Sequence, residues 1–224
     1  MRPIRAIPAT LAVLAVVAPV AAARPTVRVE TVKKEILGPT ASGSVRSYVD
    51  TVGTAHVLPA RSALGQVVAV GARYDLPVDV QFFASFSSGL LTRFGGAQSK
   101  TGGWQFTVNG APPPVGADAT VVPRNAEVVW WLIDDFATQG GLLPLDLDLV
   151  AHTRRGTLKF KVTRFDAGTG KVAGAKGAKL RINGRSLTVP ASGVVTVRLK
   201  HGRAFTARAT RADSIRSEAI RGKA

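Results

Sequence analysis

The chain has 224 residues, of which 46% are hydrophobic, and it carries 30 Lys and Arg against 14 Asp and Glu, a formal net charge of +16. This hydrophobic content excludes a wholly disordered chain. The lack of cysteine excludes disulfides, thiolate metal sites and cysteine nucleophiles, and the three histidines show no metal-ligand spacing.

Residues 1–23 have the features of a secretory signal peptide. Arg2 and Arg5 form a positive n-region, residues 6–20 are apolar and uncharged, and three alanines at 21–23 supply the small residues that signal peptidase requires. The apolar run is shorter than the roughly 20 residues that a membrane-spanning helix needs. We therefore expect a mature protein that is secreted and either extracellular or associated with the cell wall.

Charge divides the remaining chain in two. Residues 24–150 hold 10 Lys or Arg and 11 Asp or Glu, a net charge of −1, whereas residues 151–224 hold 18 and 3, a net charge of +15. Such an asymmetry predicts a first domain over 24–137 and a basic second domain over 151–224. Between them, 138–150 is either a linker or a shared strand, because its second half alternates apolar and acidic residues.

The first domain is predicted to combine strands with one helix. Residues 26–30 and 78–82 alternate in polarity as strands do, and the apolar spacing within 62–74 predicts a helix with Ser62 at its N-cap. Further strands are expected at 104–108, 120–122 and 127–133.

The strand at 104–108 leads into a turn. Trp104 and Phe106 share one face of this strand, and the Asn109-Gly110 pair that follows favours a type I′ hairpin turn. The run at 127–133 is apolar on both faces, which predicts a central strand. Its adjacent tryptophans must point to opposite faces, so one of them faces a second layer, the neighbouring domain or a ligand. The candidate ligand-binding residues are Trp104, Asn109, Gly110 and Trp131.

These residues also resemble a known family. The segments Gly103-Trp104, Val108-Asn109-Gly110, Gly116-Ala117 and Glu127-Val128-Val129-Trp130 resemble the transcobalamin C-terminal-like domain of the soluble ligand-binding β-grasp group. The resemblance implies a β-grasp fold and an unidentified small ligand or protein partner. In that family's vitamin carriers the domain closes over cobalamin against a helical barrel. This chain has no such barrel, so cobalamin is not expected as the ligand.

Residues 151–224 predict a small β-sandwich, because short strands alternate with turn signals such as Asn183-Gly184. The segment resembles bacterial immunoglobulin-like or carboxypeptidase-regulatory-like modules. We thus expect a mainly β protein, with a β-grasp-like α+β domain followed by a small immunoglobulin-like sandwich.

Basic residues of the second domain fall on one face of each strand, which is either a solvated surface or a binding surface. We expect anionic cell-envelope polymers or lipid headgroups as partners, because the density of positive charge exceeds what solubility needs. Specific nucleic-acid binding is not expected, since the domain lacks Tyr and Trp for base stacking. The candidate residues for an anionic surface are Lys159, Lys161, Lys179, Arg181, Arg198 and Lys200.

No pattern typical of catalysis is present in the sequence. It has neither a Gly-x-Ser-x-Gly elbow nor a His-Glu-x-x-His helix. A calcium site near the join, formed by Asp134, Asp135, Asp146 and Asp148, is a minor alternative, because these residues lack the usual alternating Asp loop with its glycine. We expect no metal or cofactor. The leading hypothesis is a noncatalytic, secreted binding protein of the cell envelope. The alternative is a purely structural or adhesive surface module without a small-molecule ligand.

Overall fold

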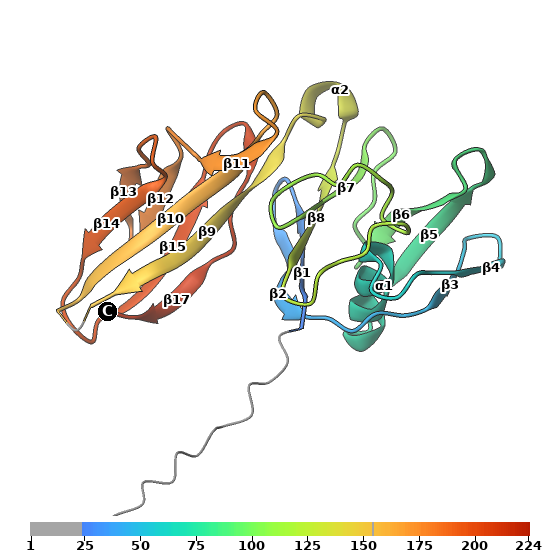
Figure 1. Ribbon diagram of the computed structural model, residues 1–224, viewed down its shortest axis with the longest axis horizontal. Coiled ribbons are helices and arrows are strands. Elements are labelled where there is room, and N and C mark those ends of the chain that lie inside the picture. Colours follow the sequence, from blue (N-terminus) through green and yellow to red (C-terminus); the bar gives the residue numbers. More distant parts are fainter. Residues whose placement is uncertain (1–23, 154) are drawn as a thin grey trace, which may run out of the picture.

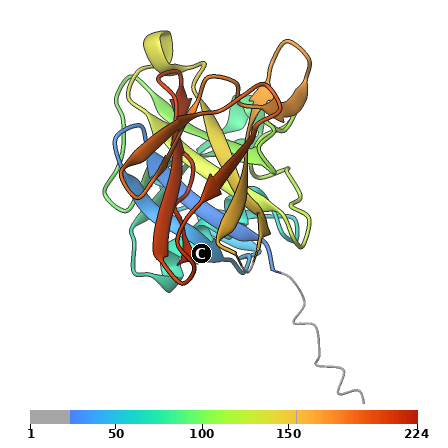
Figure 2. The same ribbon diagram turned by 90° about the vertical axis from the view of Figure 1, so that its left-hand side faces the viewer.

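A computed structural model describes residues 24–153 and 155–224, which are mainly β and form two units side by side (Figure 1). The expected signal peptide falls on residues 1–23, outside the described residues. Within the described part, no helix combines the length and apolar character needed to cross a membrane. Figure 2 views the molecule from the side of the second unit, which lies in front of the first.

The first unit is built on a mixed four-stranded sheet. Its strand order is β2 (Glu35–Ala41), β1 (Thr26–Thr31), β8 (Glu127–Ile133) and β7 (Gly103–Val108). The two central strands, β1 and β8, run parallel, and each edge strand is antiparallel to its neighbour. The central place of β8 confirms the prediction from its two apolar faces.

Helix α1 (Ala63–Arg73) covers one face of this sheet. The Ser62 hydroxyl accepts a hydrogen bond from the Gly65 amide at 3.0 Å, which confirms the predicted N-cap. The apolar stripe of the helix is buried against Val27, Val29 and Trp130 of the sheet. One face of the first sheet therefore belongs to the hydrophobic core of this unit.

Two hairpins complete the first unit. The first joins β3 (Ser47–Val49) to β4 (Ala55–Val57), and the second joins β5 (Val78–Phe83) to β6 (Ser88–Phe94) through a short 3-10 turn, η1 (Ala84–Phe86). Each hairpin is a separate two-stranded sheet, although β6 lies next to β7. Of these strands, only β5 was predicted from the sequence.

The predicted hairpin after β7 is only partly correct. Asn109 and Gly110 have φ values of 50° and 76°, as a type I′ turn requires, but only an isolated bridge from Val108 to Ala111 follows them. Three prolines at 112–114 lack amide donors and stop the pairing, so β7 pairs with the distant β8. The strand expected at 120–122 was wrong, because its backbone instead bonds to the start of α1.

The second unit consists of two sheets that face each other. One contains β11 (Lys171–Gly174), β10 (Thr157–Asp166), β9 (Leu143–His152) and β16 (Ser214–Ile215), with β14 (Val194–Arg198) also paired to β10. The other contains β13 (Arg185–Thr188), β12 (Lys179–Ile182), β15 (Ala204–Thr210) and β17 (Ile220–Lys223). Their apolar faces share one core, in which Phe160 and Phe205 meet edge to face at 5.8 Å.

The join between the units is short. Residues 138–150 contain the end of α2 (Phe136–Gln139) and the start of β9, which pairs with β10 and so belongs to the second unit. Val129, Trp131 and Ile133 form the second face of β8 and pack on Ile215 of the second unit. Trp130 and Trp131 thus face opposite layers, as predicted, and the layer that covers Trp131 is the neighbouring unit.

Candidate ligand-binding cavity

An apolar cavity of about 290 Å³ lies in the first unit, between the β5–β6 hairpin, β7 and the start of α2. It forms where β6 lies next to β7 without joining the same sheet. Among the described residues that line it, none carries a charge. Its aromatic lining consists of Phe83, Trp104, Phe106, Trp130 and Phe136.

Local structure fixes Phe136 at one wall of the cavity. Asp135 caps α2 by accepting a hydrogen bond from the Ala137 amide at 3.0 Å. Gly103 lets the ring approach β7, because a Cβ atom at this position would lie 3.0 Å from Phe136 Cζ. The side chain of Phe136 remains 53% exposed, so it is a solvent-accessible part of the lining.

The two tryptophans of the lining differ in burial. Trp130 is 2% exposed and stacks on Phe106 with ring centroids 4.8 Å apart. Trp104 is partly buried and meets Phe94 edge to face at 6.3 Å. Neither indole nitrogen has a hydrogen-bond partner among the described residues. The nitrogen of Trp131, which lies outside the cavity, is buried and likewise lacks a partner in the described part of the chain, so the aromatic surface and not the indole donors characterises this cavity.

The four predicted ligand-binding residues do not come together. Trp104 lines the cavity, whereas Trp131 is 1% exposed and lies between the two units. The Asn109 side chain accepts a hydrogen bond from the Glu127 amide at 3.0 Å and faces a separate acidic recess. Gly110 completes the turn beside it.

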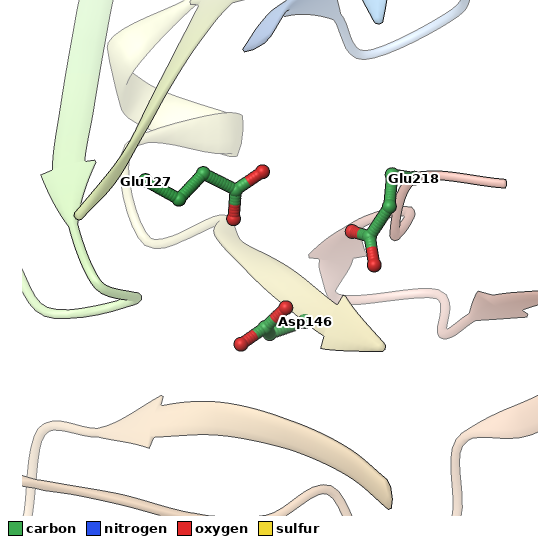
Figure 3. Close-up of side chains that lie close together, drawn as sticks. All are labelled: Glu127, Asp146 and Glu218. Carbon is green, nitrogen blue, oxygen red and sulfur yellow. The ribbon is translucent and has the colours of Figure 1, made fainter. Parts of the chain in front are cut away.

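The acidic recess is lined by four carboxylates from both units, and Figure 3 shows three of them, Glu127, Asp146 and Glu218. Carboxylate oxygens of Glu127, Asp146 and Glu218 all lie within 4.8 Å of one another. The fully buried Arg28 places Nε 3.5 Å from Glu127 and Nη1 3.8 Å from Glu218. One guanidinium balances only one of the three negative charges, so this ion network between the units favours carboxyl groups that keep their protons.

Burial dominates the electrostatics of this network. It raises the pKa of Glu218 to about 8, against the lowering effect of Arg28, and it also raises the pKa values of Glu127 and Asp146. The sequence hypothesis grouped Asp146 with Asp134 and Asp135. The structure instead places Asp135 at the cap of α2 and pairs Asp134 with Lys33 at 3.6 Å.

The predicted anionic-surface residues lie on two opposite faces of the second unit. Lys159 and Lys161 point outward from β10, where the alternate residues enter the core. Lys179 and Arg181 point outward from β12 in the facing sheet. Arg198 ends β14, which pairs with β10 and so belongs to the same sheet as Lys159 and Lys161. Lys200 is exposed just after β14. The pairs on β10 and β12 each occupy one face of their strand, as the period predicted, whereas Lys200 lies beyond the end of β14. The six residues do not form a single patch.

Comparison with known proteins gives one partial match. A family model described as a domain of unknown function (DUF4430) matches residues 79–134. No curated protein and no solved structure gives a significant match. The matched segment begins in β5 and ends just after β8, and it contains the lining of the apolar cavity except for Phe136.

Proposed function

We propose that this protein is a noncatalytic binding protein of the cell envelope. Its first unit is a β-grasp-like domain that holds a small, uncharged, largely apolar ligand in the cavity beside Trp104. Its second unit is an immunoglobulin-like domain that attaches the protein to an anionic surface. The observation that carries the proposal is a cavity of about 290 Å³ that is lined by five aromatic side chains and, among the described residues, by none that carries a charge.

Several features of the first unit support the binding function. The central parallel pair β1–β8, flanked by antiparallel strands and covered by α1, is an arrangement typical of a β-grasp domain. The cavity lies at the lower end of the roughly 300–1,000 Å³ range of small-molecule sites. Uncharged walls disfavour an ionic ligand, because the charge would lose its hydration without gaining a partner.

The charge of the second unit supports attachment to an anionic surface. Residues 151–224 carry 18 Lys or Arg against 3 Asp or Glu. A field of this size attracts polyanions over about one Debye length, roughly 8 Å at physiological ionic strength. The alternative, a structural or adhesive module, requires no ligand in the cavity and predicts no response to a cavity probe.

The first test uses N-phenyl-1-naphthylamine, a neutral aromatic probe, titrated into the purified protein while its fluorescence is measured. Two exposed phenylalanines provide a matched comparison. Phe136 is 53% exposed and lines the cavity, whereas Phe86 is 74% exposed and does not. We expect Phe136→Ala to weaken probe binding by about tenfold, near 1.4 kcal/mol, and Phe86→Ala to leave it unchanged. Equal effects of both variants, or no binding by the unaltered protein, would reject the cavity as the ligand site.

A further inference from the structure

The outer face of the β13–β12–β15–β17 sheet has an unusual composition. The four strands contain no Asp, Glu, Tyr or Trp, and their one phenylalanine, Phe205, is buried in the core. Apart from Ala204, the outward positions carry basic or hydroxyl side chains. This set, called here the basic sheet face, comprises Lys179, Arg181, Arg208, Arg221 and Lys223 with Ser186, Thr188, Thr206 and Thr210.

Strand register concentrates charge at the centre of the basic sheet face. Arg181 lies directly opposite Arg208 on the neighbouring strand, and like charges in this position are unfavourable. Arg208 is compensated by Glu35 of the first unit at 2.7 Å. Arg181 has no ion-pair partner among the described residues. It therefore presents an uncompensated positive charge that an external anion would neutralise.

A recess lies at the pair formed by Arg181 and Arg208. Its volume is about 480 Å³, and it is lined by both arginines together with the side chains of Asn183, Ser186 and Thr206. Guanidinium groups bind phosphate oxygens through paired donors, and the neighbouring hydroxyl and amide groups offer hydrogen bonds to a polar chain. The recess thus combines an anion-binding centre with partners for hydroxyl groups.

The opposite face of the sandwich is less suited to an anion. Lys161 on β10 lies opposite Asp148 on β9, so an acidic side chain interrupts the basic residues. Exposed valines, Val150 and Val194, lie at the ends of strands in the same sheet. This mixed composition distinguishes that face from the basic sheet face, although both belong to the same unit.

We infer that the basic sheet face binds a linear envelope polymer of phosphodiester-linked polyols. Lys179 and Arg181 on β12, and Arg221 and Lys223 on β17, form two pairs of cations, each pair spaced by roughly 7 Å along its strand. The two strands are separated by β15, so the pairs can meet successive phosphates of a linear chain. Alternating hydroxyl side chains suit a polymer that carries hydroxyl groups between its phosphates. The face offers no aromatic residue for stacking a nucleic-acid base and no large apolar residue for entering a bilayer.

This inference rests on the proposed attachment of the second unit to an anionic surface, and it assigns that attachment to one face. The test compares two variants that each lose four positive charges from exposed side chains of the second unit. The face variant carries glutamine at Lys179, Arg181, Arg221 and Lys223. The control variant carries glutamine at Lys159, Lys161, Arg198 and Lys200. Arg208 is retained in both variants because it pairs with Glu35.

Binding of the full protein to purified poly(glycerol phosphate) is measured at about 0.15 M salt. We expect the face variant to lose at least about tenfold in affinity and the control variant less than about threefold. Equal losses would overturn the assignment to this face while leaving the general attraction to polyanions intact. A larger loss in the control variant would place the binding surface on the opposite face and would also overturn the inference.

Two further arms test the identity of the occupant. One uses vesicles of phosphatidylcholine and phosphatidylglycerol in equal parts, and the other uses single-stranded DNA. Preferred binding to the polymer supports the inference. Preferred binding to vesicles or to DNA overturns the polymer as the occupant, although the attraction to polyanions stands. If the unaltered protein binds none of the three, the inference and the proposed anionic attachment both fail.

Discussion

Trp104 and Trp130 lie on adjacent strands and contribute differently to the first unit. Trp130 is 2% exposed at the centre of the core, whereas Trp104 is partly buried on the edge strand β7 and lines the cavity. An aromatic side chain in a close-packed core is held by contacts on all sides, and its removal leaves a void. A side chain at the edge of a sheet lacks some of these contacts and is available to a ligand.

We predict that Trp130→Ala destabilises the protein more than Trp104→Ala. Loss of the buried side chain should cost about 3–5 kcal/mol, with a smaller cost for the partly buried one. Urea denaturation gives the free energies of unfolding, and titration with the naphthylamine probe gives the loss of binding for Trp104→Ala. Trp131→Ala is the control, because it removes a buried tryptophan outside the cavity and should leave probe binding unchanged. A reversed ranking of stability would show that Trp104 is chiefly a core residue.

At the scale of elements, the Asn183-Gly184 turn fixes the β12–β13 hairpin. The hairpin between β12 and β13 is closed by Asn183 and Gly184, with φ values of 47° and 81°. The side chain of Asn183 also donates to the Ala204 carbonyl at 2.9 Å and accepts from the Thr206 amide at 3.1 Å. This turn therefore positions β12 and β15, which carry both arginines of the basic sheet face.

Gly184→Ala is expected to destabilise the protein by about 1–2 kcal/mol, because an L-residue pays that cost in the left-handed region. A Cβ atom at this position would meet nothing within 4 Å, so the cost comes from the backbone alone. Gly43→Ala is the matched control, since its surroundings are equally open and its φ lies outside the left-handed region. Thermal unfolding of both variants checks the prediction, and it is contradicted if Gly43→Ala lowers the melting temperature as much as Gly184→Ala.

The elements that could be predicted from the sequence are those with local signals. Helix α1 has its cap at Ser62, β8 is apolar on both faces, and each Asn-Gly pair adopts the expected turn. Strand β2 was missed because Gly38 and Pro39 interrupt it and irregular register with β1 breaks the period of two. Strand order and pairing depend on contacts between distant segments, which a local pattern does not report.

Of the residues predicted from the sequence to bind a ligand, only Trp104 lines the cavity. The cavity also needs Phe83, Leu90 and Phe136, which come from three other elements and share no motif with β7. Likewise, no spacing in the sequence relates Glu127 to Glu218, which meet because the two units pack against each other. The split of the basic residues between two faces also depends on which strands share a sheet.

At the scale of the whole molecule, an apolar cluster and an ion network join the units. The cluster buries Trp131 against Ile215. In the network, Arg28 of β1 donates to the Arg216 carbonyl at 3.1 Å and to the Leu145 carbonyl at 3.4 Å. Removing a partner from such a network leaves a buried charge unpaired, which is strongly unfavourable. The carboxyl groups of Glu218, Glu127 and Asp146 are buried where the units meet, and this burial raises their pKa values.

Burial raises the pKa of Glu218 from its ordinary 4.5 to about 8, and it raises the pKa values of Glu127 and Asp146 in the same direction. Arg28 faces Glu218 from β1, Glu127 faces it from β8 and Asp146 from β9. The folded protein therefore holds protons that the unfolded chain releases above about pH 4.5. The stabilisation from these protons is fully present below the pKa that the carboxyl groups have in the unfolded chain. It is lost as the pH rises through the folded-state pKa of Glu218, about 8.

We predict that the free energy of unfolding falls between about pH 5 and pH 9, with a slope of up to about 1.4 kcal/mol per pH unit for each proton involved. Glu218→Gln should flatten this dependence, because glutamine has no proton to lose in that range. The control is Asp213→Asn. Burial raises the pKa of Asp213, but Arg164 and Arg211 together lower it by more, so the stabilisation from Asp213 is present above about pH 4 and is lost only at more acidic pH. Asp213→Asn should shift the curve without changing its slope above pH 5, because both of its partners are arginines that stay charged across this range. Urea denaturation across this range measures all three curves, and an unchanged slope in Glu218→Gln would show that Glu218 does not carry the pH dependence of stability.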